Sequence, residues 1–289
     1  MSTVAWLGTG VMGAPMACHL KEKGYDVCAY NRTYEKAAAL EKFGIRAFPV
    51  LKQAVSDADY VFSILGFPSD VEEVYLGEDG VLANVKKGAV LIDMTTSSPS
   101  LAVRLYKEGK ARGIYVLDAP VSGGDKGAKN ATLSIMVGGD REAFDKVLPL
   151  LASLGTSINF MGGPGCGQHT KMCNQICVAG ATAAYTEAIA YAQAVGLDCE
   201  KMLSAIQGGA AGSWQLTNMA PRALKGDFDP GFYVKHFVKD MQIAHNVASK
   251  NDLELPMLDA VLAQYEKMAE NGMGNDGTQA LIKLYDENK

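Results

Sequence analysis

A glycine-rich turn near the N-terminus constrains the fold of this chain more than any other feature. The apolar segment Thr3–Leu7 is followed by Gly8, Gly10 and Gly13 in the spacing G-x-G-x-x-G, and a helical pattern begins at once. In such a turn the second glycine lets a pyrophosphate reach the backbone, and the helix N-terminus attracts its charge. The spacing alone also occurs in plain loops, but the order strand, loop, helix predicts a dinucleotide site. The expected cofactor contacts of this loop are Gly8, Thr9, Gly10, Val11, Met12 and Gly13.

The end of the second expected strand, Val27–Tyr30, is expected to lie near the ribose of that cofactor. An NAD site usually has an acidic residue there, whereas this chain has Asn31, Arg32 and Thr33. An acid would repel a 2′-phosphate, while an arginine fork pairs with it and the two neighbours can donate hydrogen bonds. The pattern favours NADP(H), with NAD(H) still possible. The alternative is that Arg32 is a solvated loop residue next to the following helix.

Composition excludes several classes of function. The chain has 289 residues, 48% of them hydrophobic, which suffices for two domains with separate cores. Its net charge of −5 provides neither a basic stripe for nucleic acid nor a polybasic membrane patch. We find no signal-peptide pattern at the N-terminus and no apolar run of the ~18 residues that a membrane span needs. We expect a cytoplasmic protein whose six cysteines are reduced.

The first part of the chain alternates short β runs with helical stretches, which predicts a doubly wound, mostly parallel Rossmann-type sheet. Its segments are mostly apolar throughout, as expected for strands that are covered on both faces. The expected strands are Val4–Leu7, Val27–Tyr30, Ile45–Phe48, Tyr60–Leu65, Val90–Asp93, Tyr115–Asp118, Leu133–Val137 and Ser157–Phe160.

A run of glycines and a proline at 162–165 ends this alternation. We place the domain boundary here, with a dinucleotide-binding domain at 1–163 and an all-helical domain for substrate and oligomerisation at 164–289. A long helix, rich in small residues, is expected at about 166–195 at the junction. The further expected helices are Glu200–Gln207, Ser213–Leu224, Val234–Lys250, Met257–Glu270 and Gly277–Glu287.

Three loops after later strands contain candidate contacts, because the carboxyl ends of parallel strands face the cofactor crevice. Leu65 and Pro68 are expected to wall the cofactor site, and Thr95 or Thr96 can contact the nicotinamide ribose. The serines that follow Thr96 have an alternative role as helix caps. Ser122, Gly123 and Gly124 can present a hydroxyl and successive N–H groups to a carboxylate, although an ordinary turn explains them equally well.

Lys171 lies in the second turn of the long helix, which is otherwise almost free of charge up to Glu187. A helix that is apolar all round is buried, so this lysine is expected to line a cleft, where burial disfavours its charged form. Asn174 and Gln175 share its helix face at i+3 and i+4.

Other candidates in the C-terminal half have competing explanations. Trp214 is either a core residue or a wall of the substrate pocket, and we place it at the pocket because glycines precede it. Cys166, His169, Cys173 and Cys177 share one helix face, but they lack the paired spacing of structural zinc sites, so we expect no metal. Phe232 and Asp240 flank the region of Lys239, and Phe232 is counted among the expected cofactor contacts.

Taken together, these motifs resemble the β-hydroxyacid dehydrogenase family, which includes 3-hydroxyisobutyrate dehydrogenase and semialdehyde reductases. The resemblance rests on four segments: Gly8 to Met16, Asp118 to Gly124, Gly165 to Asn174, and Lys239-Asp240. It implies that Lys171 is the catalytic lysine, that Ser122, Gly123 and Gly124 bind the substrate carboxylate, and that Lys239 lies beside the cofactor. Some members have the helix asparagine four residues after the lysine, where this chain has Gln175, so the partner of Lys171 is either Asn174 or Gln175.

The resemblance implies reduction by NADPH of a short carboxylate-bearing aldehyde, such as glyoxylate, succinic semialdehyde or tartronate semialdehyde, to the hydroxyacid. Three alternatives remain: an NAD-linked 3-hydroxyisobutyrate dehydrogenase, an imine reductase and a non-catalytic dinucleotide-binding module. Lys171 argues against the last two. A helical domain built on one long apolar helix also predicts a homodimer or homotetramer.

Overall fold

The computed structural model describes residues 2–286 and divides the chain into two compact units, 1–171 and 172–289. The division falls within the longest helix, α9 (Cys166–Ala194). The first six residues of this helix, Cys166 to Lys171, belong to unit 1, and the remainder belongs to unit 2.

Unit 1 is built on a nine-stranded sheet, which confirms the expected fold class. Its path runs β3-β2-β1-β4-β5-β6-β8-β7, and β9 pairs with β8. Strands β1 to β6 are parallel, whereas β8 is antiparallel to β6 and β7. The sequence did not predict β7, because two residues are too few for a periodic pattern. The strands are β1 (Thr3–Leu7), β2 (Asp26–Tyr30), β3 (Arg46–Phe48), β4 (Tyr60–Ser63), β5 (Val90–Asp93), β6 (Tyr115–Asp118), β7 (Val121–Ser122), β8 (Leu133–Gly138) and β9 (Gly155–Gly162).

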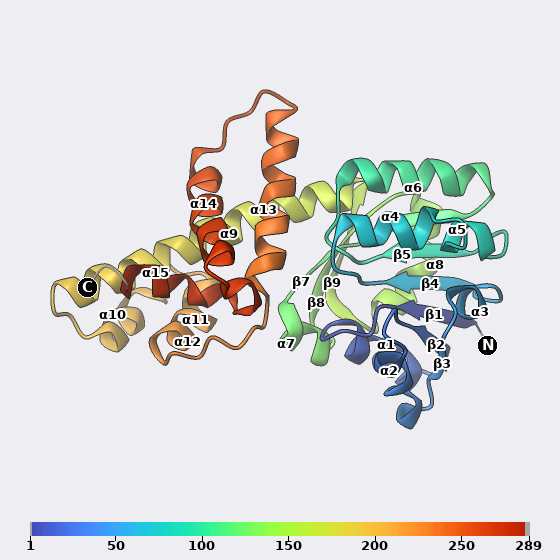
Figure 1. Cartoon of the computed structure of the whole chain (residues 1–289), viewed down its shortest axis with the longest axis horizontal. Helices are drawn as coiled ribbons and strands as arrows, with labels where there is room; N and C mark the ends of the chain where they lie inside the picture. Colours follow the sequence, from blue (N-terminus) through green and yellow to red (C-terminus); the bar gives the residue numbers. More distant parts are fainter. Residues whose placement is uncertain (1, 287–289) are drawn as a thin grey trace. The chain divides into compact units, whose positions relative to one another are not determined.

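Helices cover both faces of this sheet, and β1 shows why. Its residues alternate in direction, so that Val4 and Trp6 join a core with α1, while Ala5 and Leu7 join a second core with α4 and α6. Helices α4, α5 and α6 lie over one face in Figure 1. The helices of unit 1 are α1 (Gly13–Glu22), α2 (Tyr34–Ala38), α3 (Leu51–Val55), α4 (Pro68–Leu76), α5 (Val81–Asn84), α6 (Pro99–Ala111), α7 (Gly124–Lys129) and α8 (Arg141–Leu151), with a 3-10 turn at Glu41–Phe43.

The loop between β1 and α1 is held by close backbone contacts. Gly8 has a φ of +91°, and a Cβ there would lie 2.3 Å from the Ile64 carbonyl oxygen. The indole of buried Trp6 donates to the Gly8 carbonyl at 3.0 Å. A Cβ on Gly13 would lie 1.9 Å from that same oxygen, whereas one on Gly10 would meet no atom within 4 Å. Gly8 and Gly13 are therefore required for packing, while Gly10 leaves open space above the loop.

The N-terminus of α9 is fixed by two buried side chains of unit 1. The Asp118 carboxylate, at the end of β6, accepts hydrogen bonds from the N–H groups of Gly165 and Gln168, each at 2.8 Å. The Gln168 carboxamide donates to the Thr95 carbonyl at 2.7 Å and accepts from the Ser97 N–H at 2.9 Å. These contacts attach the start of α9 to the carboxyl ends of β5 and β6, and they satisfy N–H groups that a helix start leaves unpaired.

Unit 2 is helical in its described part, apart from an isolated bridge between Tyr233 and Gly277. The expected helix Ser213–Leu224 forms two helices, because Pro221 lacks an N–H and starts a new helix. The expected Gly277–Glu287 helix begins as a 3-10 helix, and Glu287 lies outside the described residues. Besides α9, its helices are α10 (Cys199–Ile206), α11 (Trp214–Asn218), α12 (Ala220–Leu224), α13 (Val234–Ser249), α14 (Pro256–Glu270) and α15 (Lys283–Asp286), with 3-10 turns at Met273–Asn275 and Thr278–Ile282.

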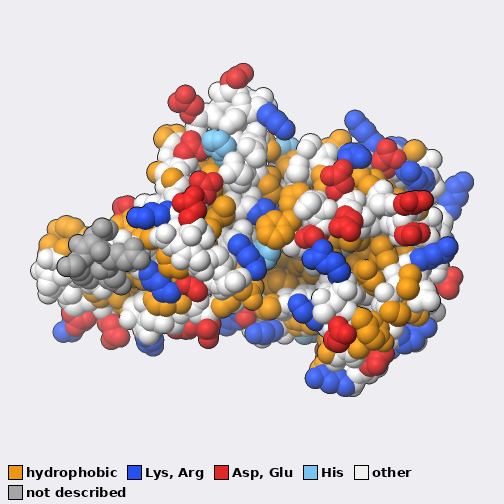
Figure 2. All heavy atoms as spheres, viewed as in Figure 1, with side chains coloured by type: hydrophobic (Ala, Val, Ile, Leu, Met, Phe, Trp, Pro, Cys, Tyr) orange, Lys and Arg blue, Asp and Glu red, His pale blue; other side chains and the backbone are white. Residues whose placement is uncertain are grey.

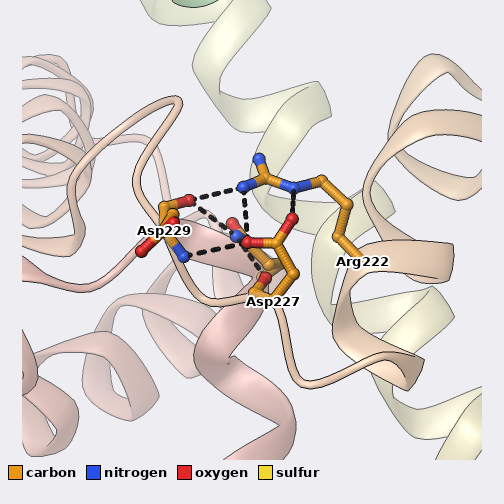
Figure 3. A network of polar contacts seen from close by, with 4 residues as sticks. Arg222, Asp227 and Asp229 are labelled. Carbon is orange, nitrogen blue, oxygen red and sulfur yellow. Dashed lines mark hydrogen bonds and ion pairs between the residues drawn. The ribbon is translucent and has the colours of Figure 1, made fainter.

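A polar network secures the loop between α12 and α13 (Figure 3). The Arg222 guanidinium donates to both oxygens of the Asp227 carboxylate, at 2.8 and 3.0 Å, and to the Asp229 carbonyl at 2.7 Å. The buried Gln279 side chain donates to the carbonyls of Asp227 and Asp229. This network fixes the first part of the loop that leads from α12 into α13.

Among residues 2–286, none of the helices is both long enough and apolar enough to cross a membrane. On the face shown in Figure 2, acidic and basic side chains are interspersed.

We predict that alanine substitutions at two glycines of the β1–α1 loop differ strongly in their effect on stability. Gly13→Ala should lower the free energy of unfolding by about 2 kcal/mol or more, because the new Cβ overlaps the Gly8 carbonyl. Gly10→Ala should change it by less than about 1 kcal/mol, since no atom lies near. Urea unfolding followed by the fluorescence of buried Trp6 measures both, and equal losses would contradict this view of the loop.

We also predict that Asp118 makes the stability of unit 1 depend on pH. Burial raises the pKa of this carboxyl to about 6, although the two N–H donors act in the opposite direction. Because the folded pKa lies above the unfolded one, the stability that Asp118 contributes is complete below about pH 4 and is lost as pH rises through 6.

The test compares the wild type with Asp118→Asn, which cannot titrate at this position. The free energy of unfolding of the wild type minus that of the variant should decrease by up to about 3 kcal/mol between pH 4 and pH 7. Urea unfolding at several pH values measures it. A difference that stays constant or increases would show that burial does not dominate at this carboxyl.

Candidate active site

The glycine-rich loop lies where the strand order of the sheet reverses. Strand β1 has β2 on one side and β4 on the other, and ligands of doubly wound sheets bind at such a point. The Thr9 N–H donates to the Asn31 Oδ1 at 3.0 Å, and Asn31 also donates to the Thr33 carbonyl at 3.0 Å. Both ends of the Asn31 carboxamide are therefore engaged in holding the loop after β2 against the glycine-rich loop.

The loop fits the pyrophosphate of a dinucleotide in two respects. The Cβ position of Gly10 is open, so a phosphate can approach the backbone there. The Thr9 hydroxyl is buried and has no hydrogen-bond partner among the described residues, which is the state expected of a group that awaits a ligand. Val11 is half exposed and Met12 is partly buried, so the loop between the last two glycines is accessible.

Arg32 and Asp70 face each other beside this loop. The side chain of Arg32 is 80% exposed, and its Nη1 lies 3.3 Å from the Asp70 Oδ1. The other Asp70 oxygen accepts the Phe67 N–H at 3.0 Å, at the start of α4. Pro68 is the first residue of α4, where its missing N–H costs nothing. The arginine that sequence reasoning selected is thus paired with an acid that it did not select.

The two threonines after β5 have different environments. The Thr95 hydroxyl is buried and accepts the Leu65 N–H at 2.8 Å, so it joins the ends of β4 and β5. The Thr95 N–H donates to the Asp93 Oδ1 at 3.1 Å. Thr96 is only partly buried, which leaves more of its surface accessible. Ser98, further along, accepts the Leu101 N–H as the N-cap of α6, as its alternative interpretation stated.

Ser122, Gly123 and Gly124 form a turn between β7 and α7. Ser122 ends β7 and pairs with Ser134 of β8. Gly123 and Gly124 both have positive φ, at +132° and +61°, and Gly123 is the N-cap residue of α7. Successive N–H groups in such a turn form a concavity that suits an anion.

Lys171 lies on α9 one turn after the segment that Asp118 and Gln168 hold, and its side chain is only 6% exposed. Helix periodicity places Asn174 and Gln175 on the same side of α9 as this lysine. Gln175 is 2% exposed and Asn174 is partly buried.

A chain of contacts within unit 2 orders the two carboxamides. The Asn174 Nδ2 donates to the Gln175 Oε1 at 2.8 Å, and the Gln175 Nε2 donates to the Asp240 Oδ2 at 2.6 Å. The Lys239 ammonium lies 3.0 Å from the other Asp240 oxygen. Both ends of the Gln175 side chain are thus occupied, so Gln175 orients Asn174 and connects α9 to α13.

For the other expected site residues of unit 2, the structure shows exposure or ordinary packing. The side chain of Trp214 is 54% exposed at the start of α11. Phe232 packs edge-on against Phe237, with their ring centroids 5.6 Å apart. Cys173 and Cys177 are exposed, and the described residues contain no group of three or more His, Cys, Asp or Glu side chains that could hold a metal.

Sequence reasoning missed the residues that hold the site in place. Asp118 and Gln168 were noted only as parts of motifs, Asp93 only as the end of an expected strand, and Asp70 was not selected at all. A polar residue at the end of an apolar strand is the signal that could have found Asp93 and Asp118. No local pattern marks Gln168, because its partners lie about 70 positions earlier in the chain.

Comparisons with known proteins agree with this geometry. Residues 3–163 match the family described as the NAD binding domain of 6-phosphogluconate dehydrogenase. Residues 165–285 match the family described as NAD-binding of NADP-dependent 3-hydroxyisobutyrate dehydrogenase. The two matches together span nearly the whole chain. The first coincides with the part that contains the sheet, and the second with the helical part.

Individual relatives are similar over their full length or most of it. The chain is 49% identical over 283 residues to an uncharacterized oxidoreductase of Bacillus subtilis, with 98% of each covered. It is 44% identical to a probable 3-hydroxyisobutyrate dehydrogenase-like protein of Arabidopsis thaliana, covering 96% of this chain and 84% of that one. A solved structure of Mycobacterium tuberculosis 3-hydroxyisobutyrate dehydrogenase with L-serine superimposes with a TM-score of 0.90 at 30% identity, covering 98% and 99%.

The glycine-rich loop at the switch point, the buried lysine at the start of α9 and these full-length matches lead to one assignment. The chain belongs to the β-hydroxyacid dehydrogenase family, and it is an NAD(P)-dependent oxidoreductase.

Proposed function

We propose that this chain reduces a short carboxylate-bearing aldehyde, such as glyoxylate or a semialdehyde, to the hydroxyacid, with NADPH as the preferred cofactor. The observation that carries the proposal is the buried Lys171 at the anchored start of α9. A lysine that is nine-tenths buried has few structural uses, and it suits the donation of a proton to a carbonyl oxygen.

Each residue of the proposed site has a separate role in the reduction. Lys171 donates a proton or a hydrogen bond to the carbonyl oxygen, where negative charge develops, and accepts the proton in the reverse direction. Asn174, held by Gln175, adds a hydrogen bond to the same oxygen. Ser122, Gly123 and Gly124 bind the carboxylate and so orient the reacting carbon. The nicotinamide, when bound, supplies the hydride.

The geometry of unit 1 supports the following cofactor contacts. The backbone from Gly8 to Gly13 and the Thr9 hydroxyl receive the pyrophosphate. Arg32 and Thr33 receive the 2′-phosphate, while Asn31 holds their loop. Leu65 and Pro68 line the adenosine side, and Thr96 contacts the nicotinamide ribose. We retain Lys239 and Phe232 as cofactor contacts and Trp214 as a substrate contact, as the family resemblance and the sequence suggest.

Several relatives support a β-hydroxyacid as product or substrate. The M. tuberculosis enzyme is named for 3-hydroxyisobutyrate and its structure holds L-serine, which is also a β-hydroxyacid. For this reason an NAD-linked oxidation of 3-hydroxyisobutyrate is the second candidate. The two candidates share the site and differ in the substrate, the favoured direction of reaction and the favoured cofactor.

The first test of this function is Lys171→Ala. We expect kcat/KM for aldehyde reduction to fall by about 10²- to 10⁴-fold, the range typical of a lost general acid. The dissociation constant of NADPH should stay within about 2-fold, because binding depends on the unit 1 loops. NADPH oxidation with glyoxylate, succinic, tartronate and methylmalonate semialdehydes measures the activity.

Lys201→Ala is the matched control, since the side chain of Lys201 is 86% exposed and lies on α10. It should leave turnover unchanged. Normal turnover of Lys171→Ala on every aldehyde would eliminate Lys171 as the catalytic residue. Activity on a cyclic imine with none on aldehydes would favour imine reduction instead.

We further propose that the chain forms a homodimer or homotetramer through the exposed side of α9 in unit 2. Along this side of α9 lie Cys173, Cys177, Ala184 and Tyr191, all exposed, with Tyr191 at 68%, and one acidic residue, Glu187, lies among them. A largely apolar stripe of this length is often a partner surface, and a second copy is the commonest partner.

Ala184→Glu places a charge in the middle of this stripe. We expect sedimentation velocity to show the wild type as a dimer or tetramer and Ala184→Glu as a monomer, because burying an unpaired carboxylate opposes assembly. Ala210→Glu, in an exposed loop, is the control and should assemble like the wild type. A monomeric wild type, or an unchanged Ala184→Glu assembly, would contradict this interface.

A further inference from the structure

The ion pair between Arg32 and Asp70 crosses the end of β1, where the cofactor is proposed to bind. Arg32 follows β2 and Asp70 lies on α4 after β4, and β1 lies between these two strands in the sheet. The pair therefore joins the loops on either side of the glycine-rich turn, with 3.3 Å between the Arg32 Nη1 and the Asp70 Oδ1. A ligand that enters beside Arg32 also meets Asp70.

The fold holds the two partners with unequal strength. Asp70 is the third residue of α4, and its second oxygen accepts the Phe67 N–H, so its carboxylate is part of the helix cap. The side chain of Asp70 is 24% exposed, whereas that of Arg32 is 80% exposed. A single exposed contact of this kind restrains an arginine weakly. The arginine is thus free to turn to a new anion, while the carboxylate stays in place.

The charges around the pair do not favour a phosphate strongly. Arg32 and Asp70 cancel each other, and the next two charged residues along the chain, Glu35 and Lys36, also have opposite signs. A phosphate monoester brings about two negative charges at neutral pH, so a fixed carboxylate nearby repels it. A ribose hydroxyl is neutral and can donate a hydrogen bond to a carboxylate.

We propose that Asp70 is a specificity-determining residue that opposes the 2′-phosphate and so keeps NADH usable beside NADPH. The proposal rests on the proposed role of Arg32 at the 2′ position. Arg32 attracts the phosphate, Asp70 weakens that attraction, and the ratio of the two affinities depends on both.

The experiment measures dissociation constants of NADPH and NADH for the full chain by titrating nicotinamide fluorescence, without substrate. Asp70→Asn keeps an oxygen for the Phe67 N–H and removes the charge. We expect it to bind NADPH about 3- to 10-fold more tightly at low salt, with NADH changed by less than about 2-fold. The gain should shrink at high salt, because screening weakens the repulsion that was removed.

Three further variants separate charge from shape and folding. Asp70→Glu keeps the charge and should keep the wild-type ratio of affinities. Asp70→Ser is a second neutral variant, in case the asparagine disturbs α4, and thermal unfolding without cofactor checks each fold. Glu78→Gln removes one charge from the exposed loop after α4 and should leave both constants unchanged.

Arg32→Ala makes the two possible failures distinguishable. If it weakens NADPH alone while Asp70→Asn leaves NADPH binding unchanged or weaker, the proposal for Asp70 is overturned and the role of Arg32 stands. If Arg32→Ala leaves the ratio of the two affinities unchanged, the proposed 2′-phosphate contact itself is wrong. Tighter NADPH binding by both neutral Asp70 variants, but not by Asp70→Glu, supports the proposal.

Discussion

The anchoring of α9 by Asp118 and Gln168 is the constraint on which the rest of unit 1's chemistry depends. Both side chains are buried, and each makes two hydrogen bonds, so the start of α9 cannot shift against the ends of β5 and β6 without leaving polar groups unpaired. The carboxylate keeps this position although burial raises its pKa. Lys171 inherits its placement from these contacts, because it lies one helical turn further along the same helix.

In unit 2, a buried side chain of the same helix is likewise hydrogen-bonded at both ends. Gln175 is fully engaged by Asn174 and Asp240, which makes it a connector between α9 and α13 and leaves Asn174 as the adaptable carboxamide. Spacing alone left open whether Asn174 or Gln175 is the partner of Lys171. Because of this arrangement we propose Asn174. A residue that both donates and accepts within a buried network is poorly suited to hold a substrate as well, since each new contact would cost an existing one.

The charges near the expected ribose site show why binding one cofactor differs from preferring it over another. Under the proposal for the ribose site, Arg32 attracts the 2′-phosphate, and the carboxylate of Asp70, which the α4 cap holds beside it, weakens that attraction. Opposing charges of this kind set a ratio of affinities rather than a single affinity, and specificity is always such a difference. On this proposal, cofactor preference depends on the loops after β2 and β4 together and not on the residues after β2 alone.

Much of this protein was predictable from local sequence, for a physical reason. The glycine spacing, the apolar strands and the charge-free helix are short-range patterns, and each reflects backbone geometry or burial that neighbouring residues decide. They sufficed for the parallel sheet, the long helix and the choice of Lys171. Only the tertiary structure decided that Asp118 and Gln168 hold α9, that Gln175 rather than Asn174 is tied to Asp240, and that Asp70 opposes Arg32. These partners are brought together by strand order and helix packing across 38 to 73 positions, and no local pattern encodes such pairings.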